Sequence, residues 1–337
     1  MPDVRDHSAQ PTIARQFWVQ APGRGAIVET RLSPRHPHEV LVETLFTGVS
    51  RGTEALVFRG QVPPSQVAVM RAPFQEGEFP GPVKYGYSNV GVVADGPAAL
   101  VGRIVFCLFP HQDHYTVPAE AVTLVPEQVP PERAVLAANL ETAVNVVWDA
   151  KPLVGDRIIV IGGGVVGILC AWLCHAIPGT VVTLIDLNPA RASVADTLGL
   201  SFKTESPTDG SADLVIHASG AGSGLVSALS AVGVEGTIVE ASWYGTKSVS
   251  LPLGEAFHSR RLTVRSSQVG RLDPSRAARW THARRLALAL RLLGDARLDA
   301  LITGESRFEE LPAVMPRLSD ALGDTLCHRI RYGSSYV

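Results

Sequence analysis

The sequence predicts an α/β protein with a β-rich first part and a doubly wound parallel sheet behind it. Strand candidates alternate with helical segments from residue 158 to about 270, which is typical of βαβ units. Short strands separated by Gly- and Pro-containing loops occupy the first ~125 residues and favour a compact barrel or sandwich. A glycine-rich turn joins the first of the later strands to its helix. These observations predict two domains.

The apolar patterns place the individual elements. Strands are expected at residues 40–46, 90–93, 104–108 and 115–117, and later at 158–161, 181–185, 214–217, 237–241 and 262–265. Helices are expected at 132–150, 274–293 and 309–318, followed by a closing strand at 325–332. Because this tail must pack against something, we expect the chain to leave its first domain and later return to it.

The charge is nearly balanced. The 30 Lys and Arg residues against 32 Asp and Glu residues give a net charge of −2, which does not favour nucleic acid as a partner. Nine arginines fall between Arg260 and Arg291, where apolar residues recur at helical spacing. We interpret these arginines as a solvated helix face, because the aromatic interleaving typical of nucleic-acid surfaces is missing.

The cysteine spacing and the N-terminal sequence indicate the cellular compartment in which the protein is expected. Cys107, Cys170, Cys174 and Cys327 form no Cys-x-x-Cys pair, which argues against a disulfide framework and a four-thiolate zinc site. Cys170 and Cys174 lie one turn apart on a helix, where we expect them to be buried. Residues 1–16 lack the apolar core of a signal peptide, and no run reaches ~18 apolar residues. We therefore expect a soluble cytoplasmic protein with no membrane partner.

The glycine-rich turn predicts a dinucleotide site. Gly162, Gly164 and Gly167 are spaced G-x-G-x-x-G between a strand and a helix that opens with Val165 and Val166. In such a unit the first glycine permits the turn, the second admits a pyrophosphate and the third allows close packing of the helix. Asp186 ends the next strand, and 186 − 167 places it 19 residues later. An acid there accepts ribose hydroxyls and repels a 2′-phosphate, so NAD(H) is the expected cofactor. Arg191 could meet a 2′-phosphate if that acid turned away.

Several segments together resemble the medium-chain dehydrogenase/reductase family. They are residues 37–42, Thr47 to Glu54, Tyr85 to Gly91 and the glycine fingerprint, so the resemblance extends over nearly the whole chain. It implies a GroES-like catalytic domain at residues 1–141, completed by 273–337, and a Rossmann domain at 142–272. The Gly-Thr-Glu and Gly-Tyr-x-x-Val-Gly forms are most similar to the zinc-free subgroup that includes the bacteriochlorophyllide hydroxyethyl dehydrogenase.

The chain departs from that family at the metal positions. Zinc-dependent members use Cys, His, and Cys or Glu at positions that match Ser50 or Gly52, Tyr87 and Ala138 here. Zinc prefers thiolate, imidazole or carboxylate ligands, so we expect no metal site. A different site built from His111, Asp113 and His114 near Cys107 is an alternative, and a polar loop leading into a strand is the simpler interpretation.

A metal-free site needs other groups to handle the substrate oxygen. Thr53 and Glu54 match the family's Ser/Thr-Asp pair, and the resemblance implies that Thr53 passes a proton between substrate and ribose. Tyr87 could donate through its phenol, and Lys84 lies close to it in the sequence. Packing or turn roles are the alternative for each of these four catalytic candidates. Glu141, beside the third metal position, is interpreted as an acid that serves the helix dipole.

The resemblance also implies further cofactor contacts. Ser219 and Gly220 match residues that line the adenosine ribose, Ala241 and Ser242 fall near the nicotinamide, and Thr142 matches a residue that packs on the nicotinamide face. The last strand of such a sheet often pairs across a dimer axis, so we expect a homodimer.

The predicted activity is that of a zinc-independent NAD(H)-dependent alcohol dehydrogenase or carbonyl reductase. It would move a hydride between nicotinamide and an alcohol or carbonyl carbon of a small or mid-sized organic substrate. The first alternative is an NAD(P)H-dependent reductase of quinones or activated alkenes, and the second is a dinucleotide-binding sensor without turnover.

Overall fold

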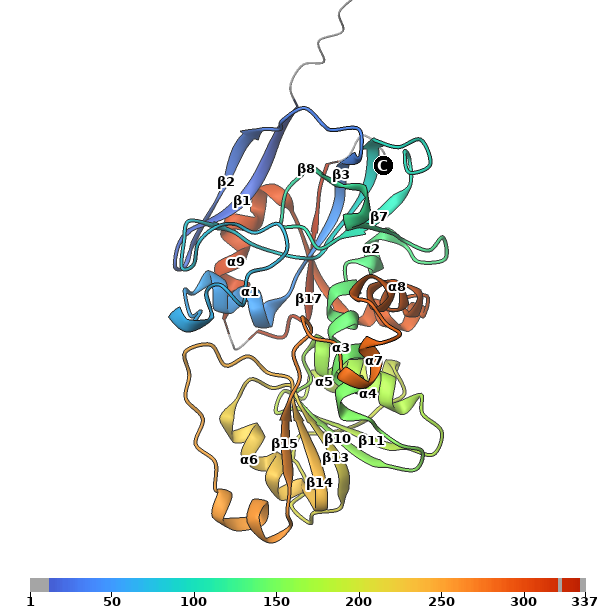
Figure 1. The fold of residues 1–337 in the computed structure, drawn as a ribbon. Helices are drawn as coiled ribbons and strands as arrows, with labels where there is room; N and C mark the ends of the chain where they lie inside the picture. Colours follow the sequence, from blue (N-terminus) through green and yellow to red (C-terminus); the bar gives the residue numbers. More distant parts are fainter. Residues whose placement is uncertain (1–11, 321–322, 334–337) are drawn as a thin grey trace, which may run out of the picture.

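The structure is a computed structural model that describes residues 12–320 and 323–333. The chain forms two lobes, an upper one built mainly from its first part and a lower one built from its middle (Figure 1). In the described part of the chain, no helix is long and apolar enough to cross a membrane. All four cysteines are buried free thiols, which confirms the burial expected for Cys170 and Cys174.

The lower lobe is a six-stranded parallel sheet, so the predicted doubly wound fold is confirmed. The strand order is β12-β11-β10-β13-β14-β15, and all neighbouring strands are parallel. From β10 the chain adds β11 and β12 on one side and then crosses to add β13, β14 and β15 on the other side, so the switch point lies between β10 and β13. The strands are β10 (Arg157–Ile161), β11 (Val181–Ile185), β12 (Ser201–Lys203), β13 (Ala212–His217), β14 (Val232–Glu240) and β15 (Thr263–Ser266), connected in part by α4 (Val165–His175), α5 (Arg191–Thr197) and α6 (Gly222–Ala231). In such sheets ligands bind outside the carboxyl ends of the strands at this switch point.

The upper lobe contains two sheets. Their orders are β2-β1-β5-β4 and β16-β17-β3-β6-β7-β9, with β8 pairing to β3. The strands are β1 (Ile13–Ala21), β2 (Arg24–Arg31), β3 (Glu39–Val49), β4 (Glu76–Gly77), β5 (Val83–Lys84), β6 (Asn89–Asp95), β7 (Ile104–Cys107), β8 (His114–Pro118), β9 (Val122–Leu124), β16 (Ile302–Arg307) and β17 (Cys327–Arg331). The β1–β2 hairpin was not predicted, because a buried polar residue, Gln16, interrupts the apolar alternation of β1.

The end of the chain returns to the upper lobe as expected. β17 pairs antiparallel with β3, and β16 lies parallel to β17. The helix α9 (Leu311–Ser319) lies between these two strands in the sequence and packs against α1 (Arg51–Phe58). The domain boundaries stay predictions, and the one between residues 141 and 142 falls inside α3 (Ala137–Ala150).

Two of the predicted helices are each divided in two. The segment 132–150 forms α2 (Pro131–Ala134) and α3, with Leu136 between them at φ −80° and ψ −5°. The segment 274–293 forms α7 (Pro274–Ala277) and α8 (His282–Leu292). Thr281 is extended there, and its side chain accepts a hydrogen bond from the Arg284 amide, so it caps a new helix.

The interpretation of the arginine-rich segment as a solvated face is wrong for Arg285. Its side chain is buried and donates to the carboxylate of Glu141 at 3.0 Å and to the backbone oxygen of Val269 at 2.6 Å. One aromatic residue of the segment lies among the charges, since Arg284 lies over the Trp280 ring, and Arg276 lies over the ring of Trp148 on α3. Glu141 therefore serves an ion pair between α3 and α8 rather than a helix dipole.

We predict that Arg285→Met destabilises the fold by about 3–5 kcal/mol, because Glu141 then keeps a buried charge without a partner. Burial already raises the pKa of Glu141, and the charge of Arg285 opposes that rise. Arg284→Met is the matched control, because the neighbouring side chain is exposed. Denaturant unfolding of both variants checks the prediction, and equal free energies of unfolding would contradict it.

Candidate functional site

The glycine fingerprint forms a tight turn at the carboxyl end of β10. Gly162 has a φ of 112°, which favours glycine, and a Cβ there would lie 2.5 Å from the amide nitrogen of Ser219. A Cβ on Gly167 would lie 1.9 Å from the carbonyl oxygen of Gly162, so α4 approaches the turn as closely as backbone allows. A Cβ on Gly164 would have no neighbour within 4 Å, and this residue lines an open cleft.

That cleft has a volume of about 270 Å³ and lies between the two lobes. The upper lobe contributes residues of α1, Tyr87 and the segment near residue 325, while the lower lobe contributes the fingerprint and the ends of β13 and β14. Eleven predicted site residues line it: Thr53, Tyr87, Thr142, Gly164, Val165, Val166, Arg191, Ser219, Gly220, Ala241 and Ser242. Sequence reasoning missed Ser50, Arg51, Asn139 and Trp243, which also line it.

Three hydroxyl groups meet on the upper wall of the cleft. The side chains of Tyr87, Ser50 and Thr53 line this wall together. Burial raises the pKa of Tyr87 to about 12, the nearby charge of Glu54 adds to the rise, and the neighbouring hydroxyls of Ser50 and Thr53 oppose it. The phenol therefore stays protonated at neutral pH and can donate to an oxygen in the cleft.

Glu54 lies behind this hydroxyl cluster rather than in the cleft. Its carboxylate accepts a hydrogen bond from the backbone amide of Ser50 at 2.8 Å and contacts Nε2 of His111 at 2.9 Å. Nδ1 of His111 lies 2.7 Å from the hydroxyl oxygen of Thr47, so hydrogen bonds connect Glu54 through His111 to the buried Thr47. Glu54 thus fixes the start of α1, which carries Thr53, and its own oxygens are occupied.

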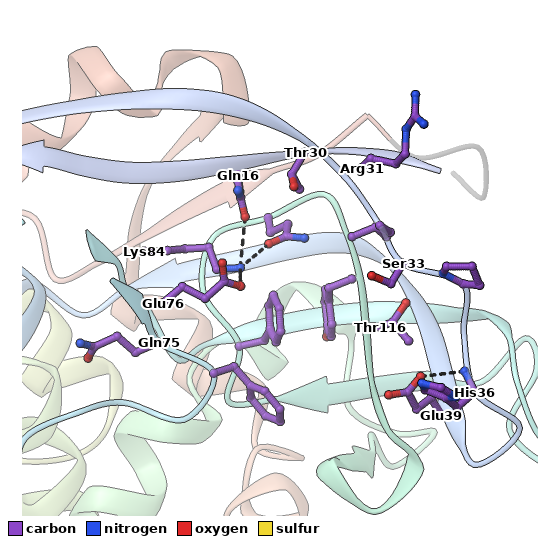
Figure 2. Close-up of a pocket in the computed structure, with 16 residues that line it drawn as sticks. Gln16, Thr30, Arg31, Ser33, His36, Glu39, Gln75, Glu76, Lys84 and Thr116 are labelled. Atoms are coloured by element: carbon purple, nitrogen blue, oxygen red, sulfur yellow. Dashed lines mark hydrogen bonds and ion pairs between the residues drawn. The ribbon is translucent and has the colours of Figure 1, made fainter. Parts of the chain in front are cut away.

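Lys84 faces a different cavity. Its ammonium donates to the amide oxygens of Gln112 at 2.9 Å and Gln16 at 3.1 Å and pairs with Glu76 (Figure 2). This second cavity, of about 460 Å³, lies within the upper lobe, and none of the residues that line the cleft belongs to it. Burial lowers the pKa of Lys84, while its hydrogen bond to Glu76 opposes the change. The structure therefore separates Lys84 from Thr53 and Tyr87.

Asp186 lies beside the fingerprint turn. One carboxylate oxygen accepts from the amide of Gly163 at 2.6 Å, and the other accepts from the amide of Asn188 at 2.8 Å. The guanidinium of Arg191 donates instead to the backbone oxygen of Asp324 in the tail of the chain. Arg191 nevertheless lines the cleft, so an arginine remains within reach of a ligand there.

The residues at the family's zinc positions do not fit the metal. They supply hydroxyls from Ser50 and Tyr87 and a methyl group from buried Ala138, and zinc prefers thiolate, imidazole or carboxylate. At the alternative site the carboxylate of Asp113 is paired with Arg15 at 2.9 Å. Among residues 12–320 and 323–333, no group of three or more His, Cys, Asp or Glu side chains is placed to hold a metal ion.

Comparison with solved structures shows which class of protein has this fold. The structure aligns with L-idonate 5-dehydrogenase from Escherichia coli at a TM-score of 0.78 over 96% of this chain and 99% of that one, with 14% identity. It also aligns with a Sinorhizobium meliloti dehydrogenase bound to NADP, at a TM-score of 0.75, and with an E. coli alcohol dehydrogenase complexed with NADH, at a TM-score of 0.74. Each of these two alignments covers 95% of this chain and 99% of the other, with 16% identity. The chain has the two-domain fold of the medium-chain dehydrogenase/reductases.

Two sequence relatives are named as a reductase and as an alcohol dehydrogenase-like protein. The chain is 25% identical over 238 residues to D-xylulose reductase A of Aspergillus oryzae, spanning 64% of this chain and 63% of that protein. It is 26% identical over 217 residues to an uncharacterised zinc-type alcohol dehydrogenase-like protein of Haemophilus influenzae, spanning 60% and 59%. No family model matches the chain. Each of these two relatives is matched over less than two thirds of its own length.

We predict that adding one methyl group destabilises the fold at one fingerprint glycine and not at another. Gly167→Ala should destabilise the fold by about 1–3 kcal/mol, because its Cβ meets the Gly162 carbonyl. Gly164→Ala should leave stability nearly unchanged, since its surroundings are open and its φ of −76° suits alanine. Thermal melts of the two variants check this contrast, and an equal loss of stability in both would contradict it.

Proposed function

We propose that this protein is an oxidoreductase that transfers a hydride between a bound nicotinamide dinucleotide and an alcohol or carbonyl carbon. The observation that carries the proposal is a single cleft lined on one side by the fingerprint residues Gly164 to Val166 and on the other by the hydroxyls of Ser50, Thr53 and Tyr87. The two structural neighbours solved with NADP and NADH, and the relatives' reductase and dehydrogenase names, support this class of reaction.

Some residues of the cleft would bind the cofactor, and others would transfer a proton to the substrate. The amides at the start of α4 and the open surface of Gly164 suit a pyrophosphate. A nicotinamide bound beside Thr142, Ala241 and Ser242 would supply or accept the hydride. During carbonyl reduction, Tyr87 would donate its phenolic proton to the substrate oxygen, and Thr53 and Ser50 would orient the phenol and relay a proton from solvent back to it.

We further propose that the reaction runs without zinc. Zinc would hold the substrate oxygen by its charge, and the side chains at the three family positions are poor zinc ligands. A neutral hydroxyl cluster can perform the same task by donating hydrogen bonds and a proton. Elemental analysis of the purified protein tests this point directly, and one tightly held zinc ion per chain would contradict it.

NAD(H) is the proposed cofactor in preference to NADP(H). Asp186 lies against Gly163 with a carboxylate that two backbone amides keep in place. A carboxylate there accepts ribose hydroxyls and repels a phosphate. Arg191 is held by the Asp324 carbonyl, which reduces its availability for a 2′-phosphate.

The substrate is proposed from the relatives' names. D-xylulose reductase A suggests polyols and ketoses. A steady-state panel of ketoses, simple ketones, quinones and enones with NADH separates the proposal from its two alternatives. Turnover of quinones and enones alone would favour the first alternative, and binding without any turnover would favour a sensor. A homodimer, a cytoplasmic location and the zinc-free subgroup stay proposals.

Removal of the Tyr87 hydroxyl should slow carbonyl reduction without weakening cofactor binding. In Tyr87→Phe we expect kcat for a ketone to fall ~10²-fold or more, the usual contribution of a general acid. Because the pKa of Tyr87 is about 12 and its protonated form is the reactive one, the wild type should show no Tyr87-dependent loss between pH 6 and 10. Steady-state kinetics and NADH titration check both points, and an unchanged kcat would remove Tyr87 from the mechanism.

Asp186→Ser should shift the cofactor preference. We expect NADH affinity to fall about tenfold, the effect of roughly 1.4 kcal/mol, while NADPH affinity stays equal or rises. Asp186→Asn is the matched control, because it keeps an acceptor oxygen and removes the charge. Fluorescence titration with both reduced cofactors measures the change, and an unaltered ratio of the two dissociation constants would contradict the proposed role.

A further inference from the structure

A fully buried histidine lies directly beneath the lower wall of the cleft. His217 ends β13, and the register of the sheet pairs it with Glu240 at the end of β14. Its Nδ1 lies 2.7 Å from a carboxylate oxygen of Glu240, and its Nε2 lies 2.6 Å from the hydroxyl oxygen of Ser219. Ser219 is exposed and lines the cleft. A partly buried acid, a buried imidazole and a cleft serine are therefore connected in series.

Glu240 is the fixed end of this series. Its oxygens also accept from the phenol of Tyr244 at 2.9 Å and from the amide of Ser242 at 2.7 Å. Burial raises the pKa of Glu240, but the hydrogen bonds from His217 and Ser242 outweigh it and leave the pKa below its ordinary value. An ionised carboxylate accepts and does not donate, so the proton on His217 lies at Nδ1.

The direction of the next hydrogen bond follows from that tautomer. When the ring carries one proton, at Nδ1, it presents a lone pair at Nε2, and Ser219 then donates its hydroxyl hydrogen to His217. The same oxygen accepts from the amide of Ala221 at 3.2 Å. In that tautomer Ser219 has a lone pair and no hydrogen toward the cleft, and it can act there as an acceptor.

The surrounding backbone preserves this arrangement. A Cβ on Gly224, in α6, would lie 2.6 Å from both Nε2 of His217 and the hydroxyl oxygen of Ser219. A Cβ on Gly162 would lie 2.5 Å from the Ser219 amide, so the serine also rests against the fingerprint turn. A buried polar pair costs desolvation free energy, and apolar residues of similar volume would pack here at lower cost. Stability alone therefore does not account for the pair.

We propose that Ser219 binds a hydroxyl group of the dinucleotide as a hydrogen-bond acceptor, and that His217 and Glu240 are the positioning residues that set its direction. This inference rests on the proposed function. A hydroxyl of the cofactor can donate to this oxygen, whereas a phosphate oxygen cannot. The network thus adds a second preference for ribose hydroxyls, on a different strand from Asp186.

The test is a double-mutant cycle on NADH affinity. Ser219→Ala removes the acceptor, and His217→Asn keeps a donor toward Glu240 but removes the acceptor at Nε2. We expect each single variant to raise the NADH dissociation constant about fivefold to tenfold. In the Ser219→Ala background, His217→Asn should add less than twofold, because the histidine acts through the serine. Titration of NADH fluorescence measures all four proteins, and thermal melts confirm that each is folded.

A control cycle uses a second hydroxyl of the same cleft. Thr142 lies on α3 and donates to the backbone oxygen of Ala138 at 2.9 Å, apart from the hydrogen bonds of His217. Thr142→Ala and His217→Asn should therefore act additively on NADH affinity. Additive effects of His217→Asn and Ser219→Ala would overturn the inference and leave the proposed function intact. Failure of the folded wild type to bind either NADH or NADPH would instead overturn the proposed function.

Discussion

The close approach of three backbone segments at the carboxyl end of the parallel sheet is the constraint on which the site depends. Gly162 contacts the first turn of α4 through Gly167 and the end of β13 through Ser219, at distances where no side chain fits. These contacts bring the start of α4 and the loop after β13 to one edge of the sheet. A ligand in the cleft would therefore meet Gly164 and Ser219 together.

Arginines from both lobes bond to the tail of the chain. Arg51, in α1, donates to the backbone oxygens of Leu318 and Gly323, and Arg191, in α5, donates to that of Asp324. These hydrogen bonds connect the tail to both walls of the cleft. Both arginines also line the cleft, and their positive charge suits the pyrophosphate of the proposed cofactor.

Sequence reasoning succeeded where the chemistry is local and failed where it depends on pairing. The fingerprint and most strands follow from residues close together in the chain. The partnership of His217 with Glu240 spans 23 residues and exists because two parallel strands share a register. Lys84 is near Tyr87 in sequence, yet β5 directs it into another cavity. The solvated-face interpretation failed at Arg285 for the same reason, since its acidic partner lies on another helix.

The hydroxyl cluster also limits how the proposed reaction could proceed. A metal ion stabilises a developing alkoxide by charge, whereas Tyr87 is neutral and has the carboxylate of Glu54 behind it. That negative charge disfavours a lasting alkoxide or phenolate at this wall. The proton must therefore transfer fully to the substrate oxygen, and the phenol must recover a proton through Thr53 or Ser50. Substrates whose negative charge is spread by conjugation need this donor least, so dependence of the rate on Tyr87 separates carbonyl reduction from enone or quinone reduction.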